Sequence, residues 1–303
     1  MAADRLRILI ASSPRMGNTW LRHLLSRLYG VPGRHVQFAG TGLQPERIAF
    51  PEEDCVCHEH FFPHRNVLDL VRREKLYLIT MLRHPADAFY SLYRYCNQRS
   101  DHYGSREDVA PIVGVPFSHE RVYENFARLM EAWILARMTA WRKSGWEDGQ
   151  GPAQPGSGKA IPVRYEDLLL DTETTLRGLT GRIRPVSQET IREAIDYCRI
   201  DRMRSRSAEL ADVCRKGQVN QWKDAFGERH LEIMRQFAEP MRELGYSLAR
   251  PALEEQEIAS LRRRLAEAAA ELACKEAELD ALRPAPAPAG EAAAPTPPPR
   301  TPA

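Results

Sequence analysis

The chain has 303 residues, of which 43% are hydrophobic, and this is enough material for one sizeable buried core. Lysine and arginine total 43 against 41 acidic residues, so the net charge of +2 gives no support for a protein that coats nucleic acid. The six cysteines are scattered, which favours reduced thiols over a disulfide framework or a zinc ribbon. These totals exclude a disulfide-stapled miniprotein and a collagen-like rod.

Apolar stretches in this sequence are short. None approaches the roughly 20 residues that a membrane-spanning helix needs. The run from Ile8 to Ala11 is also too short for the apolar region of a signal peptide, and it is typical of a buried strand. We therefore expect a cytoplasmic protein with no membrane span and no nucleic-acid partner.

Strand and helix patterns alternate through residues 1–251. The first are a strand over Arg7–Ala11 and a helix over Asn18–Tyr29, whose leucines recur at helical spacing and which stops at Gly30. The later predicted elements are a strand at 76–82, a helix from Pro85, a long helix at 122–142, a loop at 144–160, a strand at 161–165, and helices capped by Asp171 and Ser187. This order predicts an α/β fold with a mostly parallel sheet flanked by helices and with ligands at the strand carboxyl ends.

Composition changes sharply near Pro251. Residues 252–283 carry apolar side chains every seven residues, which predicts an amphipathic helix that docks on its own domain or forms a short coiled coil. The heptad positions are Ile258, Leu265, Leu272 and Leu279, with Leu261, Ala268, Lys275 and Leu282 between them. Residues 284–303 are rich in proline and alanine and cannot build a packed core. We expect a disordered tail there and a possible homo-oligomer through residues 258–282.

The first motif follows the first predicted strand and leads directly into a helix. Free backbone N–H groups at 17–19 and the positive end of the helix are suited to an anion, while Arg15 adds a cation and Thr19 a hydroxyl. Trp20 is placed to stack on a base. The segment lacks the Gly-Lys-Ser/Thr triplet of a nucleoside triphosphate loop, which argues against a magnesium-dependent ATPase or GTPase. By itself, the segment is equally compatible with a tight strand-to-helix turn.

Two other segments are also suited to anions. Arg83 ends the second predicted strand, and Ser91 lies two helical turns into the next helix, so both side chains can reach one phosphate. Arg215 and Lys216 precede Gly217, which permits close backbone approach to a ligand. Together with the first motif, these residues indicate one site for a ligand that carries several negative charges.

The motifs together resemble those of the nucleotide-dependent sulfotransferases, whose sulfuryl donor is 3'-phosphoadenosine 5'-phosphosulfate (PAPS). Residues 13–20, Ser-Pro-Arg-Met-Gly-Asn-Thr-Trp, are similar to the family's 5'-phosphosulfate loop, and their Gly-Asn-Thr-Trp-Leu-Arg continuation resembles bacterial members. Residues 83–91, 164–167 and 215–223 are similar to the family's 3'-phosphate motif, its Tyr-Glu-Asp strand end and its Arg-Lys-Gly segment. The resemblance implies that PAPS is held by Arg15, Met16, Gly17, Asn18, Thr19, Trp20, Arg83, Ser91, Tyr165, Arg215, Lys216 and Gly217.

The same resemblance implies a histidine as the general base. The family's histidine follows a strand about two dozen residues before the 3'-phosphate arginine, which gives His60 here and leaves His58 as the other candidate. A neutral imidazole is suited to take the proton of an acceptor hydroxyl near pH 7. Zinc binding is a rival interpretation of 55–64, but Cys55 and Cys57 would face the opposite side of a strand from the histidines.

We therefore predict a PAPS-dependent sulfotransferase that needs no metal, with His60 and Arg15 as catalytic residues and a glycan or hydroxylated small molecule as acceptor. Arg15 stands where the family has lysine, and it stabilises charge but is a poor proton donor. His58 also replaces a lysine. A nucleotide-binding scaffold without turnover and, less favoured, a nucleotide kinase or NTPase are the alternatives.

Overall fold

The computed structural model describes residues 5–38, 48–147, 151–206, 210 and 217–248, all within the compact unit Met1–Ala252. Its centre is a five-stranded sheet in the order β2-β5-β1-β6-β7, and every neighbouring pair is parallel. The strands are β1 (Arg7–Ala11), β2 (Gly33–Arg34), β5 (Cys55–Glu59), β6 (Tyr77–Leu82) and β7 (Ile161–Arg164). A separate antiparallel pair joins β3 (Gln37–Phe38) to β4 (Ile48–Ala49). The predicted mostly parallel α/β sheet is confirmed.

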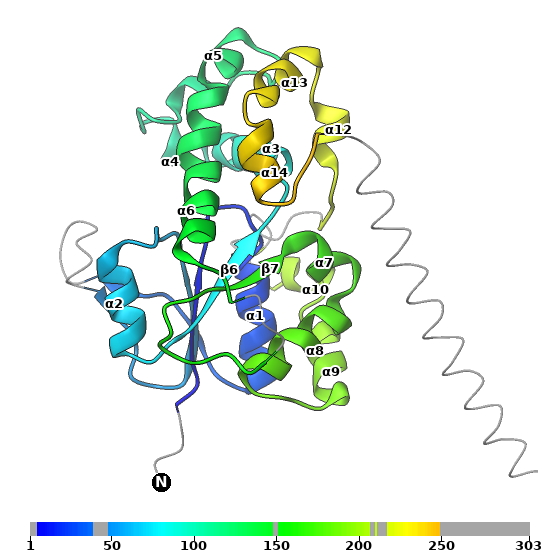
Figure 1. The fold of residues 1–303 in the computed structure, drawn as a ribbon. Coiled ribbons are helices and arrows are strands. Elements are labelled where there is room, and N and C mark those ends of the chain that lie inside the picture. The colour runs from blue at the N-terminus through cyan, green and yellow to red at the C-terminus, as the bar shows by residue number, and fades with distance from the viewer. Residues whose placement is uncertain (1–4, 39–47, 148–150, 207–209, 211–216, 249–303) are drawn as a thin grey trace, which may run out of the picture. The chain divides into compact units, whose positions relative to one another are not determined.

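Helices cover both faces of this sheet (Figure 1). Those of the first half are α1 (Asn18–Tyr29), α2 (Arg65–Arg73), α3 (Pro85–Gln98), α4 (Ser100–Tyr103), the 3-10 turn η2 (Ala110–Ile112) and α5 (Glu120–Leu129). Those that follow are the π-helix η3 (Met130–Leu135), α6 (Ala136–Ser144), α7 (Tyr165–Leu170), α8 (Thr172–Ile183), α9 (Gln188–Tyr197), α10 (Ile200–Arg204), α12 (Gln221–Ala225), α13 (Glu228–Arg235) and α14 (Ala238–Glu243). Asp171 and Ser187 cap α8 and α9 as predicted.

Side-chain alternation in the central strand divides the core between the two faces of the sheet. Ile8 and Ile10 pack in a large cluster with the leucines of α1, whereas Leu9 and Ala11 pack in a second cluster with α2. A strand buried on both faces is continuously apolar, and this is why residues 8–11 carry no polar side chain. The cysteines of β5 belong to the second cluster, so they do face away from the histidines that follow.

Two expectations about element boundaries need correction. The single helix expected over 122–142 is three consecutive segments, α5, η3 and α6, in which residues 130–135 form a π-helix. A π-helix widens the turn and rotates the residues beyond it, which periodicity counted at 3.6 residues per turn does not detect. The strand expected over 161–165 ends at Arg164, and Tyr165 begins the short helix α7.

The remaining sequence expectations fall outside the described residues. They are the helix at 252–283, the proline-rich tail at 284–303, and the oligomer through 258–282.

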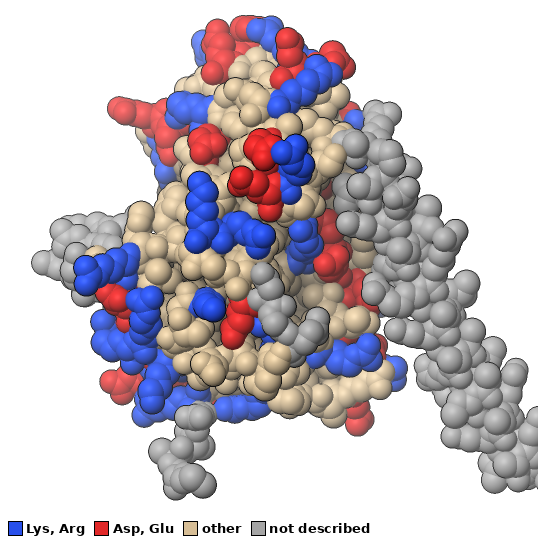
Figure 2. All heavy atoms as spheres, in the orientation of Figure 1, with Lys and Arg blue, Asp and Glu red and all other residues tan. Residues whose placement is uncertain are grey.

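On the face shown in Figure 2, basic and acidic side chains are interspersed, so no broad area of one sign covers this side of the molecule. In the part of the chain that the structure describes, no helix is both long and apolar enough to cross a membrane.

The helices beyond the end of β6 are joined by an aromatic cluster. Phe126 of α5 is fully buried, and its ring centre lies 4.1 Å from that of Phe89 in α3 and 5.6 Å from that of Phe226. His230 of α13 packs on the same ring at 5.8 Å. Because the contacts of Phe126 with Phe226 and His230 join residues about a hundred positions apart, the cluster holds the C-terminal helices to the rest of the unit.

We predict that Phe126→Ala lowers the free energy of unfolding by about 3–5 kcal/mol, because it leaves a cavity between α3, α5 and α13. Glu124 on the same helix is exposed, and Glu124→Ala should change stability by no more than about 0.5 kcal/mol. Urea denaturation of both variants measures the difference. Equal losses in the two variants would show that the aromatic cluster does not hold these helices.

Candidate functional site

Four parallel strands end at the same edge of the sheet, and each leads into one of the sequence motifs. β1 runs into the loop at 12–17, β5 into His60, β6 into Arg83 and β7 into Tyr165. A cavity of about 560 Å³ opens at this edge, and His60, Arg83 and Tyr165 all line it. Carboxyl ends of parallel strands are the usual place for ligands in such sheets, and here they bring together residues from positions 14 to 221.

The loop between β1 and α1 has the geometry of an anion cradle. Arg15 and Gly17 both have positive φ angles, of 64° and 97°, and no side chain caps the N-terminus of α1. Alternating left-handed residues turn successive N–H groups toward one point, where the helix dipole also favours negative charge. Gly17 must be glycine because a Cβ there would lie 2.6 Å from the ring of Tyr165. The absence of a side chain at Gly17 therefore allows the loop to pack directly against Tyr165, the residue that follows β7.

Two serines anchor this loop to its neighbours. Ser12 Oγ accepts a 2.9 Å hydrogen bond from the Met81 N–H, and the Ser12 N–H donates to the Glu59 carbonyl at 3.3 Å. Ser13 Oγ donates at 2.8 Å to the carbonyl of Ile134 in the π-helix. Both serines are buried. The loop is thus held by β5, β6 and η3, and it is positioned before any ligand arrives.

Arg83 is a buried cation that makes no ion pair within the described part of the chain. Its side chain is only 6% exposed, and its Nη1 and Nη2 donate to the carbonyls of Arg15 and Gln218 at 3.1 and 3.2 Å. Its Nε has no hydrogen-bond partner among these residues. The guanidinium stacks on the Tyr165 ring, 4.4 Å from the ring centre. A buried charge with no counter-ion among the described residues favours the binding of an anion beside it.

Arg15 and Ser91 are in contact at the cavity wall, although their motifs assign them to different phosphate groups. Arg15 Nε donates to Ser91 Oγ at 3.2 Å, and its guanidinium lies 4.4 Å from the centre of the Tyr95 ring. Ser91 and Tyr95 are four residues apart in α3, so both point into the cavity. The stacked ring holds the guanidinium at the cavity wall without cancelling its charge.

His60 is held by contacts on both its side chain and its backbone. Its Nδ1 lies 3.1 Å from the Ser12 carbonyl, which can only accept, so the proton is on Nδ1 and the lone pair is on Nε2. Arg137 Nε donates to the His60 carbonyl at 3.0 Å. Asn18 Nδ2 donates to the Ser13 carbonyl and lies 3.5 Å from His60 Nδ1. His60 is therefore oriented with a basic nitrogen available to a ligand.

The surroundings of the two candidate histidines keep both imidazoles neutral. Water reaches the ring of His60 through the cavity, but the protein around it lowers the pKa of His60 to about 4, chiefly through loss of solvation. Arg137 and Arg15 lower this pKa further, whereas the Ser12 carbonyl opposes them. Loss of solvation likewise lowers the pKa of His58 to about 2. His58 Nδ1 has no hydrogen-bond partner among the described residues, so its ring is less firmly oriented than that of His60.

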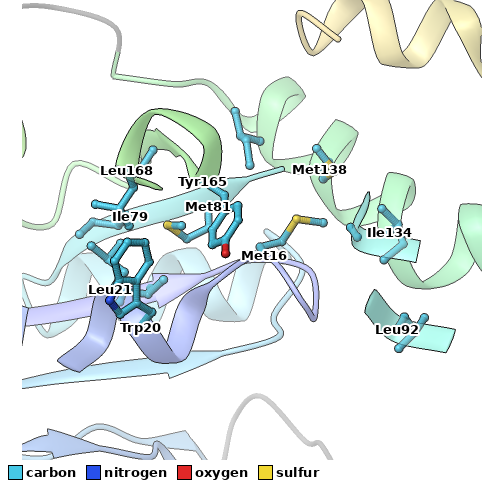
Figure 3. Packing of buried hydrophobic residues seen from close by; sticks show 14 of the residues in the cluster. Met16, Trp20, Leu21, Ile79, Met81, Leu92, Ile134, Met138, Tyr165 and Leu168 are labelled. Carbon is cyan, nitrogen blue, oxygen red and sulfur yellow. The ribbon is translucent and has the colours of Figure 1, made fainter. Parts of the chain in front are cut away.

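The three large side chains assigned to the nucleotide differ in their exposure to the cavity. Trp20 and Tyr165 both line it, with ring centres 6.2 Å apart in an edge-to-face arrangement, and Trp20 Nε1 donates to the Cys198 carbonyl. Met16 does not line it: its side chain is fully buried beside Met138 and Ile134 (Figure 3). Of Met16, only the backbone is thus available to a ligand, because its side chain anchors the loop in the core.

The last motif is described only in part, because Arg215 and Lys216 lie outside the described residues. Gly217 lines the cavity with a φ of 57°, a conformation that favours glycine. Behind it, the buried carboxylate of Asp87 accepts the N–H groups of Asn220 at 2.7 Å and of Trp222 at 3.0 Å. Asp87 therefore ties the start of α12, and with it the segment that carries Gly217, to the first turn of α3.

A second buried carboxylate fastens the chain that follows α14. Glu166 Oε1 accepts the N–H of His84 at 2.7 Å, and Oε2 accepts the hydroxyl of Tyr246 at 3.2 Å. Burial raises the pKa of Glu166, although the His84 N–H acts in the opposite direction. Both carboxylates thus bind groups of the fold itself, and neither lines the cavity.

The sequence analysis missed about half of the cavity wall. The residues it did not assign are Pro14, Arg22, His23, His35, Leu92, Arg94, Tyr95, Tyr103, Arg106, Trp133, Ile200, Leu210, Gln218 and Gln221. Helical spacing contained a signal for some of them, since Arg22 and His23 follow Asn18 and Thr19 by four residues. Trp133 could not be found in this way, because the π-helix sets its direction.

The cavity wall is strongly cationic. Its described lining includes five arginines and four histidines and neither aspartate nor glutamate. Nowhere in the described ranges do three or more His, Cys, Asp or Glu side chains form a group that could hold a metal ion. The arrangement is therefore built for a polyanionic ligand, with a basic imidazole beside it.

Comparison with protein families identifies the domain that contains this cavity. The model of the sulfotransferase domain matches residues 5–245, which include every strand and all the motifs above. The chain belongs to the sulfotransferase family. The resemblance to the sulfotransferases, predicted from the four motifs, is confirmed.

Solved structures share the fold of this sulfotransferase at low sequence identity. Mouse sulfotransferase SULT7A1, solved with PAP, is 16% identical with a TM-score of 0.59, over 85% of this chain and 90% of that one. A retinol dehydratase solved with androsterone and the inactive cofactor PAP is also 16% identical, with a TM-score of 0.52, over 82% and 84%. No curated protein sequence matches the chain significantly.

Gly17→Ala should weaken nucleotide binding by this sulfotransferase by about tenfold or more, because the new methyl group meets the Tyr165 ring and the positive φ becomes strained. Gly178 in α8 is the matched control, since a Cβ there meets nothing within 4 Å. Isothermal titration with adenosine 3',5'-bisphosphate compares the two. Unchanged affinity in Gly17→Ala would mean that the loop does not hold the ligand.

Asp87→Asn should raise the dissociation constant of adenosine 3',5'-bisphosphate, because an amide has one acceptor oxygen for two N–H donors and the segment carrying Gly217 loosens. Glu166→Gln is the comparison, because that carboxylate is similarly buried but accepts from His84 and Tyr246 and not from the segment that carries Gly217. We expect both variants to lose thermal stability and only Asp87→Asn to lose several-fold in affinity. The same affinity loss in both would remove this specific role from Asp87.

Proposed function

We propose that this protein transfers a sulfuryl group from PAPS to the hydroxyl group of an acceptor, with His60 as the general base. When bound, PAPS supplies an activated sulfuryl group and a bisphosphate leaving group. Family membership and the likeness of the fold to PAP complexes support this assignment. The observation that carries it is the buried, unpaired guanidinium of Arg83 at the end of β6.

The residues present fit this donor. Arg83 and Ser91 would bind the 3'-phosphate, the group that distinguishes PAPS from ATP, and Arg215, Lys216 and Gly217 would complete that part of the site. A guanidinium with an unused Nε–H, buried and without a counter-ion, is suited to a doubly charged phosphate. Trp20 and Tyr165 line the cavity where an adenine would lie.

The loop at 12–17 and the first turn of α1 would bind the 5'-phosphosulfate. The N–H groups of residues 17–19 and the helix dipole would stabilise negative charge on the leaving phosphate, together with the hydroxyl of Thr19. Arg15 contributes a fixed positive charge. Because it is held between Ser91 and Tyr95, little reorganisation is needed when charge develops.

His60 would remove the proton of the acceptor hydroxyl. The Ser12 carbonyl holds the ring proton on Nδ1, so Nε2 presents a lone pair to the cavity. The lowered pKa keeps His60 in its basic form at neutral pH. His58 is less suited to this role, because nothing in the described chain orients its ring by a hydrogen bond at Nδ1.

The acceptor would occupy the end of the cavity lined by Tyr95, Tyr103 and Trp133. Aromatic walls suit either the C–H face of a sugar ring in a glycan or a flat ring of a hydroxylated small molecule. The retinol dehydratase structure contains androsterone, a small hydroxylated ligand of that protein.

The cytoplasmic location and the oligomer through residues 258–282 stay predictions.

Adenosine 3',5'-bisphosphate should raise the melting temperature of the protein by several degrees without magnesium, because it binds the folded state only. ADP and 5'-AMP lack the 3'-phosphate that Arg83 would bind, so they should stabilise it much less. A thermal-shift titration with each nucleotide, with and without magnesium, makes the comparison. A preference for ADP with magnesium would favour an NTPase. A bisphosphate-bound protein that transfers to no acceptor would favour the scaffold.

His60→Ala should lower the rate of sulfation by about 100- to 10,000-fold while leaving bisphosphate affinity nearly unchanged. The base must be unprotonated, and its pKa is lowered from 6.5 to about 4. The wild-type kcat/KM should therefore stay constant as pH falls below 6.5 and decline only toward pH 4. A pH–rate profile measured by bisphosphate release tests this.

His58→Asn provides the comparison for the base. It should retain the decline toward pH 4, because His60 still titrates in that variant. If the decline disappears in the His58 variant and persists in His60→Ala, the general base is His58. A decline centred near pH 6.5 in the wild type would contradict the lowered pKa of His60.

A further inference from the structure

The cavity of this protein contains more positive charge than the nucleotide accounts for. Arg15 and Arg83 are assigned to the two phosphate groups, and the described lining still includes Arg22, Arg94 and Arg106 with no carboxylate among them. Arg106 is already neutralised, because its Nε and Nη2 bind both oxygens of Asp108 at 3.2 and 2.9 Å. Arg94 lies over Tyr90, with 5.7 Å between guanidinium carbon and ring centre, and no described contact links it to His60.

Arg22 belongs to a row of basic side chains that is continuous with the proposed base, and in this row the guanidinium carries the positive charge. Its Nη1 lies 3.0 Å from His35 Nε2, the His35 ring centre lies 5.2 Å from that of His58, and the His58 ring centre lies 6.2 Å from that of His60. All four side chains line the cavity. They come from α1, from the residue after β2, and from the end of β5, and the parallel pairing of β2 with β5 brings these segments together.

The hydrogen-bonding capacity of His58 is only partly used by the described residues. His58 Nδ1 has no partner within the described residues, although its surroundings deprive it of water. The nearest carboxylate is that of Glu59, 3.7 Å from His35 Nδ1, and it does not line the cavity. Burial raises the pKa of Glu59 to about 7, so this carboxyl is partly protonated at neutral pH and offsets the charge of Arg22 incompletely.

We infer that Arg22, His35 and His58 form a subsite for an anionic group of the acceptor, so that the preferred acceptors are hydroxylated acids. This inference rests on the proposed function. The Arg22 guanidinium, whose Nη1 donates to His35 Nε2 and which lies beside the ring of His58, suits a carboxylate or a sulfate. The ring centres of His58 and His60 are 6.2 Å apart. The hydroxyl group and the acidic group of such an acceptor should therefore be separated by about one aromatic or sugar ring.

Para-hydroxybenzoate and para-hydroxybenzamide test the subsite, because they have nearly the same shape and differ in charge. Both are titrated calorimetrically at pH 7.5 into enzyme saturated with adenosine 3',5'-bisphosphate, so that neither can bind in place of the nucleotide. We expect the carboxylate to bind about tenfold or more tightly than the amide, as for a hydrogen bond to a charged group. Equal affinities, or no binding of the carboxylate, overturn the subsite.

Three variants test whether Arg22 causes the tighter binding of the carboxylate. In Arg22→Gln the ratio of the two dissociation constants should fall toward one, and in Arg22→Lys, which keeps the charge, it should stay above that of Arg22→Gln. Arg34→Gln is the matched control, because Arg34 is a nearby exposed arginine paired with Glu53, and only its backbone carbonyl contacts Arg22. It should retain the wild-type ratio. A ratio that survives Arg22→Gln, or that falls equally in Arg34→Gln, overturns the assignment.

Sulfation rates separate the subsite from the proposed function. If the bisphosphate does not bind, the proposed function fails and the inference fails with it. If the bisphosphate binds and sulfation occurs with both phenols at equal kcat/KM, the function stands and the acid subsite is wrong. Preferential sulfation of the carboxylate, reduced by Arg22→Gln, supports both.

Discussion

The buried charge of Arg83 is the constraint around which this site is arranged. A guanidinium taken from water without a counter-ion is costly, and it persists here because the carbonyls of Arg15 and Gln218 and the ring of Tyr165 hold it. These partners come from the loop after β1, from the segment before α12 and from the end of β7. The same interaction that solvates Arg83 therefore fixes the relative positions of three parts of the cavity wall, and it leaves the charge free for a ligand.

Acidic side chains around the cavity are used differently from basic ones. Asp87 and Glu166 are as buried as Arg83, but each accepts hydrogen bonds from other parts of the fold. They hold the segments before α12 and after α14 against the carboxyl edge of the sheet. Because the carboxylates face the scaffold, the cavity keeps the positive potential that a polyanionic donor requires.

The π-helix connects the loop at 12–17 with the aromatic part of the cavity wall. Ser13 of the loop donates to the carbonyl of Ile134, and Trp133 in the same π turn lines the cavity. One helical turn later, Arg137 holds the carbonyl of His60. A regular α-helix over these residues would direct Trp133 elsewhere, so the irregularity serves to place an aromatic wall and the proposed base on one side of the loop.

The sequence by itself determined the strands β1, β5, β6 and β7, the helix after the loop, the order of the motifs and the family, because each depends on local spacing that a chain expresses directly. It did not predict β2, β3 and β4, because strands of two residues are too short to show a pattern. It also identified Arg15, Gly17, Arg83, Ser91 and Tyr165, all of which line the cavity. Met16 was assigned from its place in the motif, but the core takes its side chain. Which residues meet across the fold could not be predicted from spacing alone.

Only the tertiary structure decided three features of the site. The Ser12 carbonyl sets the tautomer of His60, the buried Asp87 anchors a segment 133 residues away, and Arg22 reaches His58 through His35. Each depends on the parallel order of the strands, which places the ends of distant segments at one edge of the sheet. Such proximity is a property of the packed sheet, and no local pattern of residues encodes it.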